Sequence, residues 1–318
     1  MRFLLMIEPQ QGLSYLEQLE IARRAEALGF EGLFRSDHYQ SFPGPSGMPT
    51  TDAWTVLAGL ARETRTISLG ALVSPVTFRL PGNFAKVVMT AHEMSGGRIE
   101  MGIGAGWNEE EHKQHAFPFP PIETRAEMLE EQLEIILGLW ERPDGWSFRG
   151  RHYTVEGSRF APKPEPGRRP RVIVGGDGTP RSLRIAARHA DEFNVTGATP
   201  EKAAEVYARL DVECQKIGRN PATIIRSTMV GALIASDAAG LNRRAEHMMR
   251  RVGRPGGEDP AEWLATRRPR WVMGNYEEAR ATIGRYEAAG VERIMLQDML
   301  PWDLDMVEEM GRELVARG

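Results

Sequence analysis

The feature that most constrains the fold of this chain is an alternation of short apolar runs with amphipathic helical stretches, repeated over nearly the whole length. Most of the runs lack an alternation of apolar and polar residues, which fits parallel strands that are buried on both faces. We expect eight strands, at residues 3–7, 32–35, 67–73, 99–104, 172–174, 192–195, 227–234 and 293–296.

The stretches between the runs have the apolar spacing of helices. In the stretch 127–140, for example, Leu129, Leu133 and Ile136 share one face, and 304–316 repeats the pattern. Strand and helix alternating eight times predict an α/β fold, a (β/α)8 TIM barrel, as a single domain over residues 1–318. Two segments, near 143–170 and 250–270, do not fit the alternation and are expected to be loop insertions. The first is predicted to form a short hairpin.

Composition excludes several classes of protein. The formal net charge is -4 and no block of like charge occurs, so we expect no nucleic-acid partner. A single cysteine, Cys214, excludes a disulfide framework and any Cys-cluster metal site. No apolar run approaches the roughly 18 residues of a membrane span, and Glu8 and Pro9 end the first run well short of a signal-peptide core. We therefore expect a cytoplasmic protein without a membrane partner.

In such a barrel the active site lies at the carboxyl ends of the strands, so the polar residues after each run are its candidates. Asp37 and His38 follow the second run, where a carboxylate beside an imidazole can orient a ring and move a proton. A pair of loop residues that caps a strand end is the alternative interpretation. Gly106 belongs to a glycine-rich stretch after the fourth run, which lets backbone approach a ligand. Glu111 follows in an acidic helix start, where carboxylates usually serve as dipole partners.

The fifth run ends in glycines and opens directly into a helix, which is the geometry of a phosphate site because free N–H groups at a helix start face an anion. It is not a dinucleotide fingerprint, since Arg181 stands where a third small residue is needed, and a Walker loop would require a lysine. A plain glycine-rich connector is the alternative. The predicted cofactor-binding residues of this loop are Gly175, Gly176, Asp177, Gly178 and Thr179.

Histidine spacing gives little support for a metal site. The chain has no HExxH motif and no HxH on its first strand, so a metal-dependent barrel hydrolase lacks its ligands. Glu111 and His115, four residues apart, share a helix face, but most such pairs are solvated. We predict no metal.

Several motifs, in order and spacing, resemble those of the luciferase-like monooxygenase superfamily, and more closely its branch that uses coenzyme F420, a deazaflavin, in place of FMN. The resemblance covers essentially the whole chain. Its motifs are Ser36-Asp37-His38, the stretch 72–81, Met94-Ser95-Gly96-Gly97-Arg98, Gly104-Ala105-Gly106-Trp107, and Gly175-Gly176-Asp177-Gly178.

The resemblance implies a barrel that binds a flavin or deazaflavin at its mouth, as a homodimer or larger homo-oligomer. Asp37 and His38 would lie beside the deazaflavin ring. Ser74 matches a strand-three position that often follows a non-prolyl cis peptide, which would support one face of the ring. The glycine loop would hold the cofactor phosphate. Sugar-phosphate dehydrogenases of the family carry a carboxylate where this chain has Trp107, so the proton donor would shift to Glu109 or Glu111.

The expected activity is reversible hydride transfer between coenzyme F420 and a small organic substrate, because the chemistry belongs to the cofactor. One alternative is an FMN-dependent monooxygenase that uses reduced flavin and oxygen and needs a partner flavin reductase. A second alternative is a non-catalytic flavin-binding protein. The sequence separates the two cofactors poorly.

Overall fold

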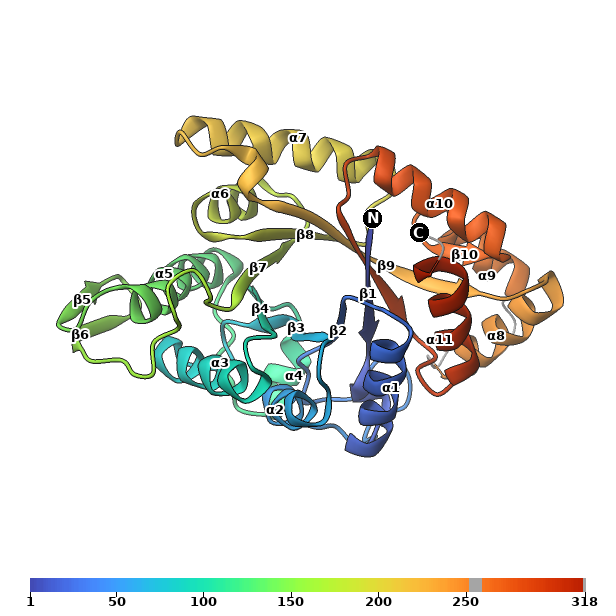
Figure 1. Ribbon diagram of the computed structural model, residues 1–318, viewed down its shortest axis with the longest axis horizontal. Coiled ribbons are helices and arrows are strands. Elements are labelled where there is room, and N and C mark those ends of the chain that lie inside the picture. The colour runs from blue at the N-terminus through green and yellow to red at the C-terminus, as the bar shows by residue number, and fades with distance from the viewer. Residues whose placement is uncertain (252–258, 317–318) are drawn as a thin grey trace.

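The computed structural model describes residues 1–251 and 259–316. Eight parallel strands pair in chain order, and the last returns to the first, so the sheet closes into the predicted (β/α)8 barrel (Figure 1). The strands are β1 (Arg2–Ile7), β2 (Gly32–Arg35), β3 (Ser68–Pro75), β4 (Ile99–Gly104), β7 (Arg171–Gly176), β8 (Glu192–Thr196), β9 (Ile225–Ile234) and β11 (Arg293–Asp298).

Helices cover the outside of the barrel (Figure 1). Their starts follow local signals: the side chains of Asp52, Thr179 and Thr199 each accept a backbone N–H from the first helical turn. The helices are α1 (Tyr15–Ala27), α2 (Ala53–Glu63), α3 (Pro81–Ser95), α4 (Glu109–Gln114), α5 (Ile122–Glu141), α6 (Pro180–His189), α7 (Pro200–Lys216), α8 (Ala238–Arg251), α9 (Pro260–Arg267), α10 (Tyr276–Ala288) and α11 (Leu304–Met310).

The hydrophobic core has two parts because successive side chains of a strand point to opposite faces. Phe3, Leu5 and Ile7 of β1 pack outward against the helices. Leu4 and Met6 point into the barrel, where they meet side chains of other strands. Both faces of the strand are therefore apolar, which explains its continuous apolar run.

Some predicted boundaries were wrong. A strand that was not predicted, β10 (Val272–Gly274), pairs with the far end of β9, and its three residues are too few to show a periodicity. The predicted helix 304–316 is helical throughout but changes its hydrogen bonding, since α11 ends at Met310 and a π-helical turn, Gly311–Val315, continues it. At this turn Gly311 lies against Leu28 so closely that a Cβ would come within 2.6 Å of the Leu28 Cβ.

The first insertion contains the predicted hairpin, formed by the antiparallel strands β5 (Trp146–Arg149) and β6 (Thr154–Ser158). In the second insertion, predicted near 250–270, the structure shows α9, while residues 252–258 lie outside the described residues. Among the helices that the structure describes, none is both long enough and apolar enough to span a membrane.

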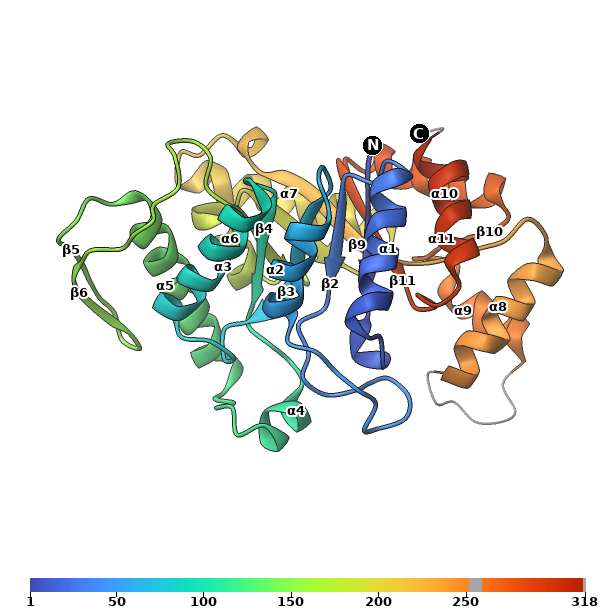
Figure 2. The same cartoon turned by 60° about the horizontal axis from the view of Figure 1, so that its bottom comes forward.

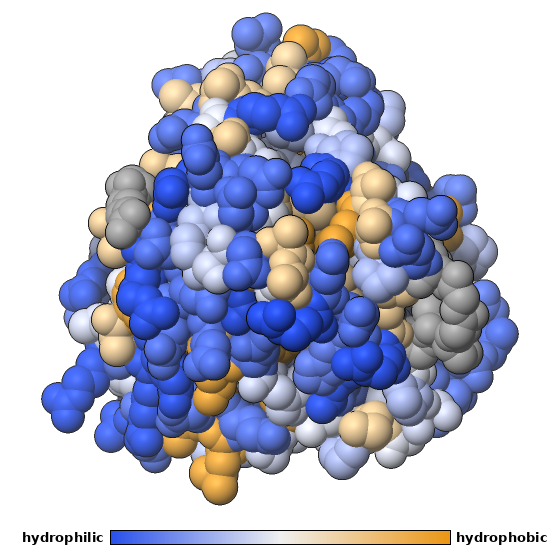
Figure 3. All heavy atoms as spheres, turned by 90° about the vertical axis from the view of Figure 1, so that its right-hand side faces the viewer, coloured by the Kyte–Doolittle hydropathy of each residue, from blue (hydrophilic) through white to orange (hydrophobic). Residues whose placement is uncertain are grey.

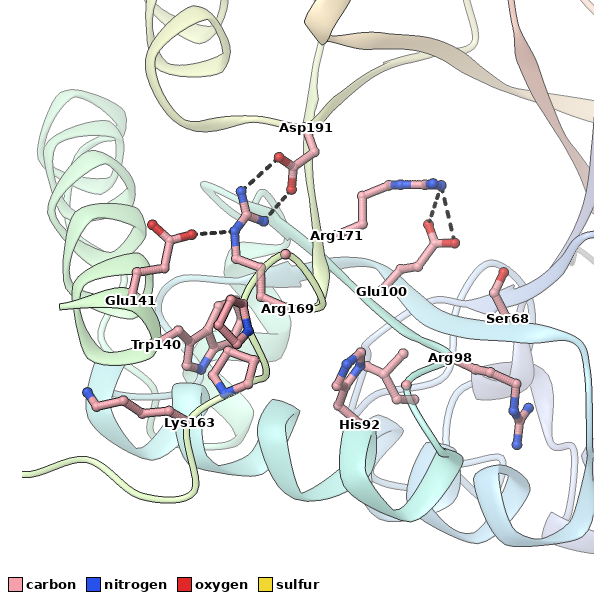
Figure 4. A pocket seen from close by; sticks show the side chains of 15 residues that line it. Ser68, His92, Arg98, Glu100, Trp140, Glu141, Lys163, Arg169, Arg171 and Asp191 are labelled. Carbon is pink, nitrogen blue, oxygen red and sulfur yellow. Dashed lines mark hydrogen bonds and ion pairs between the residues drawn. The ribbon is translucent and has the colours of Figure 1, made fainter. Parts of the chain in front are cut away.

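The amino end of the barrel is closed by ion pairs. Arg293 donates to both oxygens of Glu100, at 2.8 and 2.9 Å, and to Glu192, and all three are buried. Burial raises the pKa of Glu192. Next to this cluster lies a cavity of about 910 Å³, in which Arg169 bonds Asp191 and Glu141 while Arg171 meets Glu100 (Figure 4). These charged groups pair with one another, so we assign them a structural role.

The molecular face on the side of α8, α9 and α11 is largely hydrophilic, and its apolar groups are small and separated (Figure 3). Monomeric proteins commonly show such scattered apolar side chains. This view of the described residues gives no reason to place an interface there.

Candidate active site

A second cavity, of about 570 Å³, lies at the carboxyl ends of the strands, where the fold places active sites. Its volume is in the range of small-molecule sites. Helix α4 and the segment between β2 and α2 project from this side of the barrel (Figure 2). Of the predicted site residues, His38, Gly106, Glu111, Gly175, Gly176 and Asp177 line the cavity.

The central feature of the site is a contact between His38 and Glu111. The side chain of Asn108 caps α4 by accepting the N–H of Glu111, and this turns the Glu111 carboxylate inward, where it is 1% exposed. Glu111 Oε2 lies 2.9 Å from His38 Nδ1, and Oε1 accepts the N–H groups of Tyr39 and Gln40. An ionised carboxylate only accepts hydrogen bonds, so Nδ1 carries the proton and Nε2 is left for the cavity.

Aromatic rings enclose one side of His38. Phe42 makes an edge contact with the imidazole at 4.4 Å between centroids, and Trp107 lies 6.0 Å away. Phe42 and Trp107 also contact each other at 5.3 Å. Trp107 is 65% exposed and stands at the rim of the cavity. These apolar rings limit the access of water to the imidazole.

Asp37 points away from the cavity and is not among its lining residues. Its Oδ2 accepts hydrogen bonds of 2.6 Å from Ser74 Oγ and from Arg79 Nη1, and the carboxylate is 1% exposed. Ser74 in turn accepts the indole N–H of Trp54. The adjacent residues Asp37 and His38 therefore point in different directions. Neither Asp37 nor Ser74 lines the cavity, and their hydrogen bonds support the loop and β3.

A second carboxylate completes this supporting network. Arg79 also bonds Asp52 at 2.7 Å, and the hydroxyl of Tyr39 donates to Asp52 at 2.6 Å. Burial acts to raise the pKa of Asp52, but the hydrogen bonds from Tyr39 and Thr55 and the charge of Arg79 outweigh it and hold the pKa at about 2. Asp52 thus remains charged at neutral pH under the loop that carries His38.

The floor of the cavity is apolar and lies close to backbone. A cis peptide joins Leu72 to Val73, one peptide bond before the bond to Ser74. The Val73 side chain fills the space beside two glycines, because a Cβ at Gly104 or Gly175 would lie 2.7 or 2.9 Å from it. Gly106 has a φ of +80°, a conformation that favours glycine.

Only part of the predicted phosphate loop lines the cavity. Gly175, Gly176 and Asp177 line the cavity, whereas Gly178 and Thr179 do not. Asp177 Oδ1 accepts the N–H of Thr179, and Thr179 Oγ1 accepts the N–H of Ser182. Within the described part of the chain, the N–H groups of Gly178 and Arg181 make no hydrogen bond. Two donors at this helix start are therefore left for an anion.

A polar group that the sequence analysis missed lies at the ends of three neighbouring strands. Glu8 follows β1, and its carboxylate accepts N–H groups from Gln10, at 2.8 Å, and from Gln297. Ser36 donates to Gln10 at 2.6 Å. All four residues line the cavity. The rule that directed attention to residues after each strand would have found Glu8 and Gln297.

His112 also lines the cavity but already has two partners. Its Nδ1 lies 2.6 Å from the Asn108 carbonyl oxygen, which only accepts, so Nδ1 carries a proton. Its Nε2 lies 2.6 Å from the hydroxyl oxygen of Thr77, within hydrogen-bond distance. Among the described residues, no group of three or more His, Cys, Asp or Glu side chains is arranged to hold a metal ion. The carboxylate of Glu111 bonds His38 and the backbone N–H groups of Tyr39 and Gln40.

Sequence comparison gives a family match over almost the whole chain. The model of the luciferase-like monooxygenase family matches residues 1–308. The chain is 29% identical over 210 residues to the pyrimidine monooxygenase RutA of Stutzerimonas stutzeri, covering 63% of this chain and 56% of the relative. It is 31% identical over 207 residues to the F420-dependent glucose-6-phosphate dehydrogenase of Microbacterium testaceum, covering 64% and 60%. The matches thus span little more than half of each relative.

Two solved structures share the fold over nearly their whole length. An F420-dependent secondary alcohol dehydrogenase superposes with a TM-score of 0.84 at 18% identity, covering 99% of this chain and 98% of that one. The monooxygenase RslO1 from Streptomyces bottropensis gives 0.83 at 19% identity, covering 100% and 99%. At these sequence identities the structural similarity establishes a shared barrel fold and does not identify the reaction.

Proposed function

Because the chain belongs to the luciferase-like monooxygenase family, we propose that it is an oxidoreductase that transfers a hydride between coenzyme F420 and a small organic substrate. The observation that carries the proposal is the His38–Glu111 contact at the cavity. Removing a hydride from an alcohol carbon releases a proton from its oxygen, and an oriented imidazole is suited to accept it near neutral pH. Relatives named for F420 support this choice of cofactor.

The residues present fit a flat ring with an anionic tail. Val73, Gly104 and Gly175 form an apolar floor on which a ring system can lie against backbone. The unbonded N–H groups of Gly178 and Arg181 would hold a phosphate at the start of α6. A deazaflavin bound there would carry two electrons in the form of a hydride.

His38 and Glu111 have separate roles in this proposal. His38 Nε2 accepts the hydroxyl proton of the substrate alcohol while the hydrogen on carbon leaves with its electron pair, and in the reverse direction it returns the proton. Glu111 holds the proton on Nδ1 and stabilises the imidazolium that forms. Glu111 is therefore a positioning residue. Glu109, the other predicted donor, is exposed, pairs with Lys113 and does not line the cavity.

The first test is equilibrium binding of the purified protein to coenzyme F420 and to FMN, each oxidised and reduced, followed by fluorescence. We expect tight binding of the deazaflavin and weak binding of FMN. A preference for reduced FMN together with oxygen consumption would overturn the proposal in favour of a monooxygenase that is served by a separate flavin reductase. Deazaflavin binding without turnover of any alcohol or carbonyl compound would point to a non-catalytic flavin-binding protein.

The second test separates the two side chains. His38→Ala should lower turnover by roughly 10²- to 10⁴-fold and leave F420 binding within about tenfold. Glu111→Gln should lower kcat as well and move the acidic limb of the pH–rate profile, because the imidazolium loses its carboxylate. Glu109→Gln on the same helix is the matched control and should change neither. An unchanged rate for His38→Ala would remove this residue from the reaction.

A further inference from the structure

The carboxylate of Glu8 is buried and makes no ion pair within the described chain. Its side chain lies at the end of β1, and the residue is 6% exposed. Within the described chain its hydrogen-bond donors are the amides of Gln10 and Gln297. The nearby guanidinium of Arg35 directs its N–H groups to Ser36, Gln18 and Thr51 instead. Burying a carboxylate in this way is unfavourable, because amide donors compensate its lost hydration only in part.

The bonds of Glu8 leave acceptor capacity on the cavity side. A carboxylate has about four acceptor positions, and Glu8 uses one on each oxygen. Glu8 lines the same cavity as His38. The strand pairing places Met6 beside Gln297 and Ile7 beside Arg35, so Glu8 lies on the strand next to the one that leads into His38. A substrate whose hydroxyl faces His38 therefore has Glu8 close to its other groups.

The charge of the cavity has one sign. Glu8, Glu111 and Asp177 contribute carboxylates, and none of the lining residues that the structure describes is a lysine or an arginine. His112 has hydrogen-bond partners at both ring nitrogens, which leaves the imidazole of His38 to accept the proton in the reaction. An anionic substrate would approach a carboxylate that makes no ion pair within the described chain, in a partly desolvated site where like charges repel strongly.

We infer, resting on the proposed function, that Glu8 determines the substrate class. The cavity takes a small secondary alcohol or ketone that is uncharged or cationic and that donates a hydrogen bond to Glu8. Carboxylates and phosphate esters are rejected. The chain would thereby differ in substrate from its relative that is named for glucose 6-phosphate.

The test uses three compounds that share one secondary alcohol, CH₃–CHOH–, and differ in the group beside it: 1-amino-2-propanol, 1,2-propanediol and lactate. Each is titrated into the purified full-length protein, with and without F420, and its dissociation constant is measured by thermal shift. F420 reduction is followed separately by absorbance. The variants are Glu8→Gln, which keeps the shape and removes the charge, and Glu109→Gln, which removes an exposed carboxylate outside the cavity.

In the wild type we expect 1-amino-2-propanol and 1,2-propanediol to bind at least about tenfold more tightly than lactate. Glu8→Gln should weaken 1-amino-2-propanol by about tenfold or more and leave lactate unchanged or tighter, so that the discrimination falls. Glu109→Gln should retain the wild-type pattern. Equal binding of lactate and 1,2-propanediol, the same change for all three compounds in Glu8→Gln, or binding of none of them would overturn the inference.

The two proposals fail in different ways. If F420 binds and is reduced by an alcohol while charge makes no difference, the substrate inference is wrong and hydride transfer stands. If F420 does not bind, the proposed function is wrong, and the titrations of the cofactor-free protein still report whether Glu8 selects by charge.

Discussion

Asp298 ends β11 with a completely buried side chain, and its neutralisation by mutation should stabilise the protein in a pH-dependent way. One carboxylate oxygen accepts the N–H of Leu300 at 2.7 Å, and within the described chain the other has no hydrogen-bond partner. Burial raises the pKa of Asp298 from 3.8 to about 7, and the charge of Asp303 adds to this while Arg244 opposes it. Between these two values the folded protein holds a proton that the unfolded chain has released.

The sign and size follow from this difference in bound protons. The contribution of Asp298 to the free energy of unfolding is fully present below the pKa of the unfolded chain. It is lost as the pH rises through about 7, at roughly 1.4 kcal/mol per pH unit between the two pKa values. From about pH 5 to about pH 8 the wild type should thus lose roughly 2.6 kcal/mol of unfolding free energy through this group. Asp298→Asn cannot ionise, so it should lose none of this and should be more stable than the wild type at about pH 8.

The assay is urea unfolding of wild type and variant at about pH 5 and about pH 8, with the exposed Asp305 changed to Asn as the control. The control should follow the wild type. If Asp298→Asn keeps the wild-type dependence on pH, or is less stable than the wild type at the higher pH, the assignment of a raised pKa to this carboxyl is refuted.

Three further predictions concern packing and charge. Gly104→Ala should weaken F420 binding at least about tenfold, because the new Cβ would meet the side chain of Val73. The double variant with Val73→Ala should recover binding, and purely additive effects of the two substitutions would contradict this reasoning. Gly231→Ala should cost about 1–3 kcal/mol by urea unfolding, since Trp271 lies 2.2 Å from the new Cβ, whereas Gly82→Ala, with open space around it, should cost nothing. Asp52→Asn should lower the urea concentration at the unfolding midpoint at neutral pH, because Asp52 stabilises the fold only when it is ionised. The effect should disappear as the pH falls through about 2, and an equal effect at neutral pH and near pH 2 would argue against this role.

The barrel could be predicted from the sequence because its signal is repeated eight times and most of the strands carry apolar residues on both faces. The caps at Asp52 and Thr199 were visible as well, since they depend on neighbouring residues alone. β10 could not be predicted, because three residues carry no period and its pairing with β9 depends on tertiary contacts.

The site was predicted in part. The carboxyl-end rule led to His38 and Gly175, but the direction of a side chain in an irregular loop depends on its partners. Asp37 turns away because Arg79, 42 residues later, binds it. The contact between His38 and Glu111 spans 73 residues and depends on the short helix α4. Glu8 and Gln297 could have been predicted as well, because both follow apolar runs and so lie at the carboxyl ends of strands.

The three bonds that Glu111 accepts have a consequence for how this fold can diversify. The Glu111 carboxylate connects the segment after β2 to the segment after β4 through hydrogen bonds. The orientation of the His38 imidazole and the contact between these two loops therefore depend on the same few hydrogen bonds. A substitution that loosens the closure to admit a larger molecule would also misalign His38. Enlarging the cavity without loss of turnover therefore requires changes elsewhere, such as at Met229 on β9 or Met299 after β11, whose positions do not depend on that fastening.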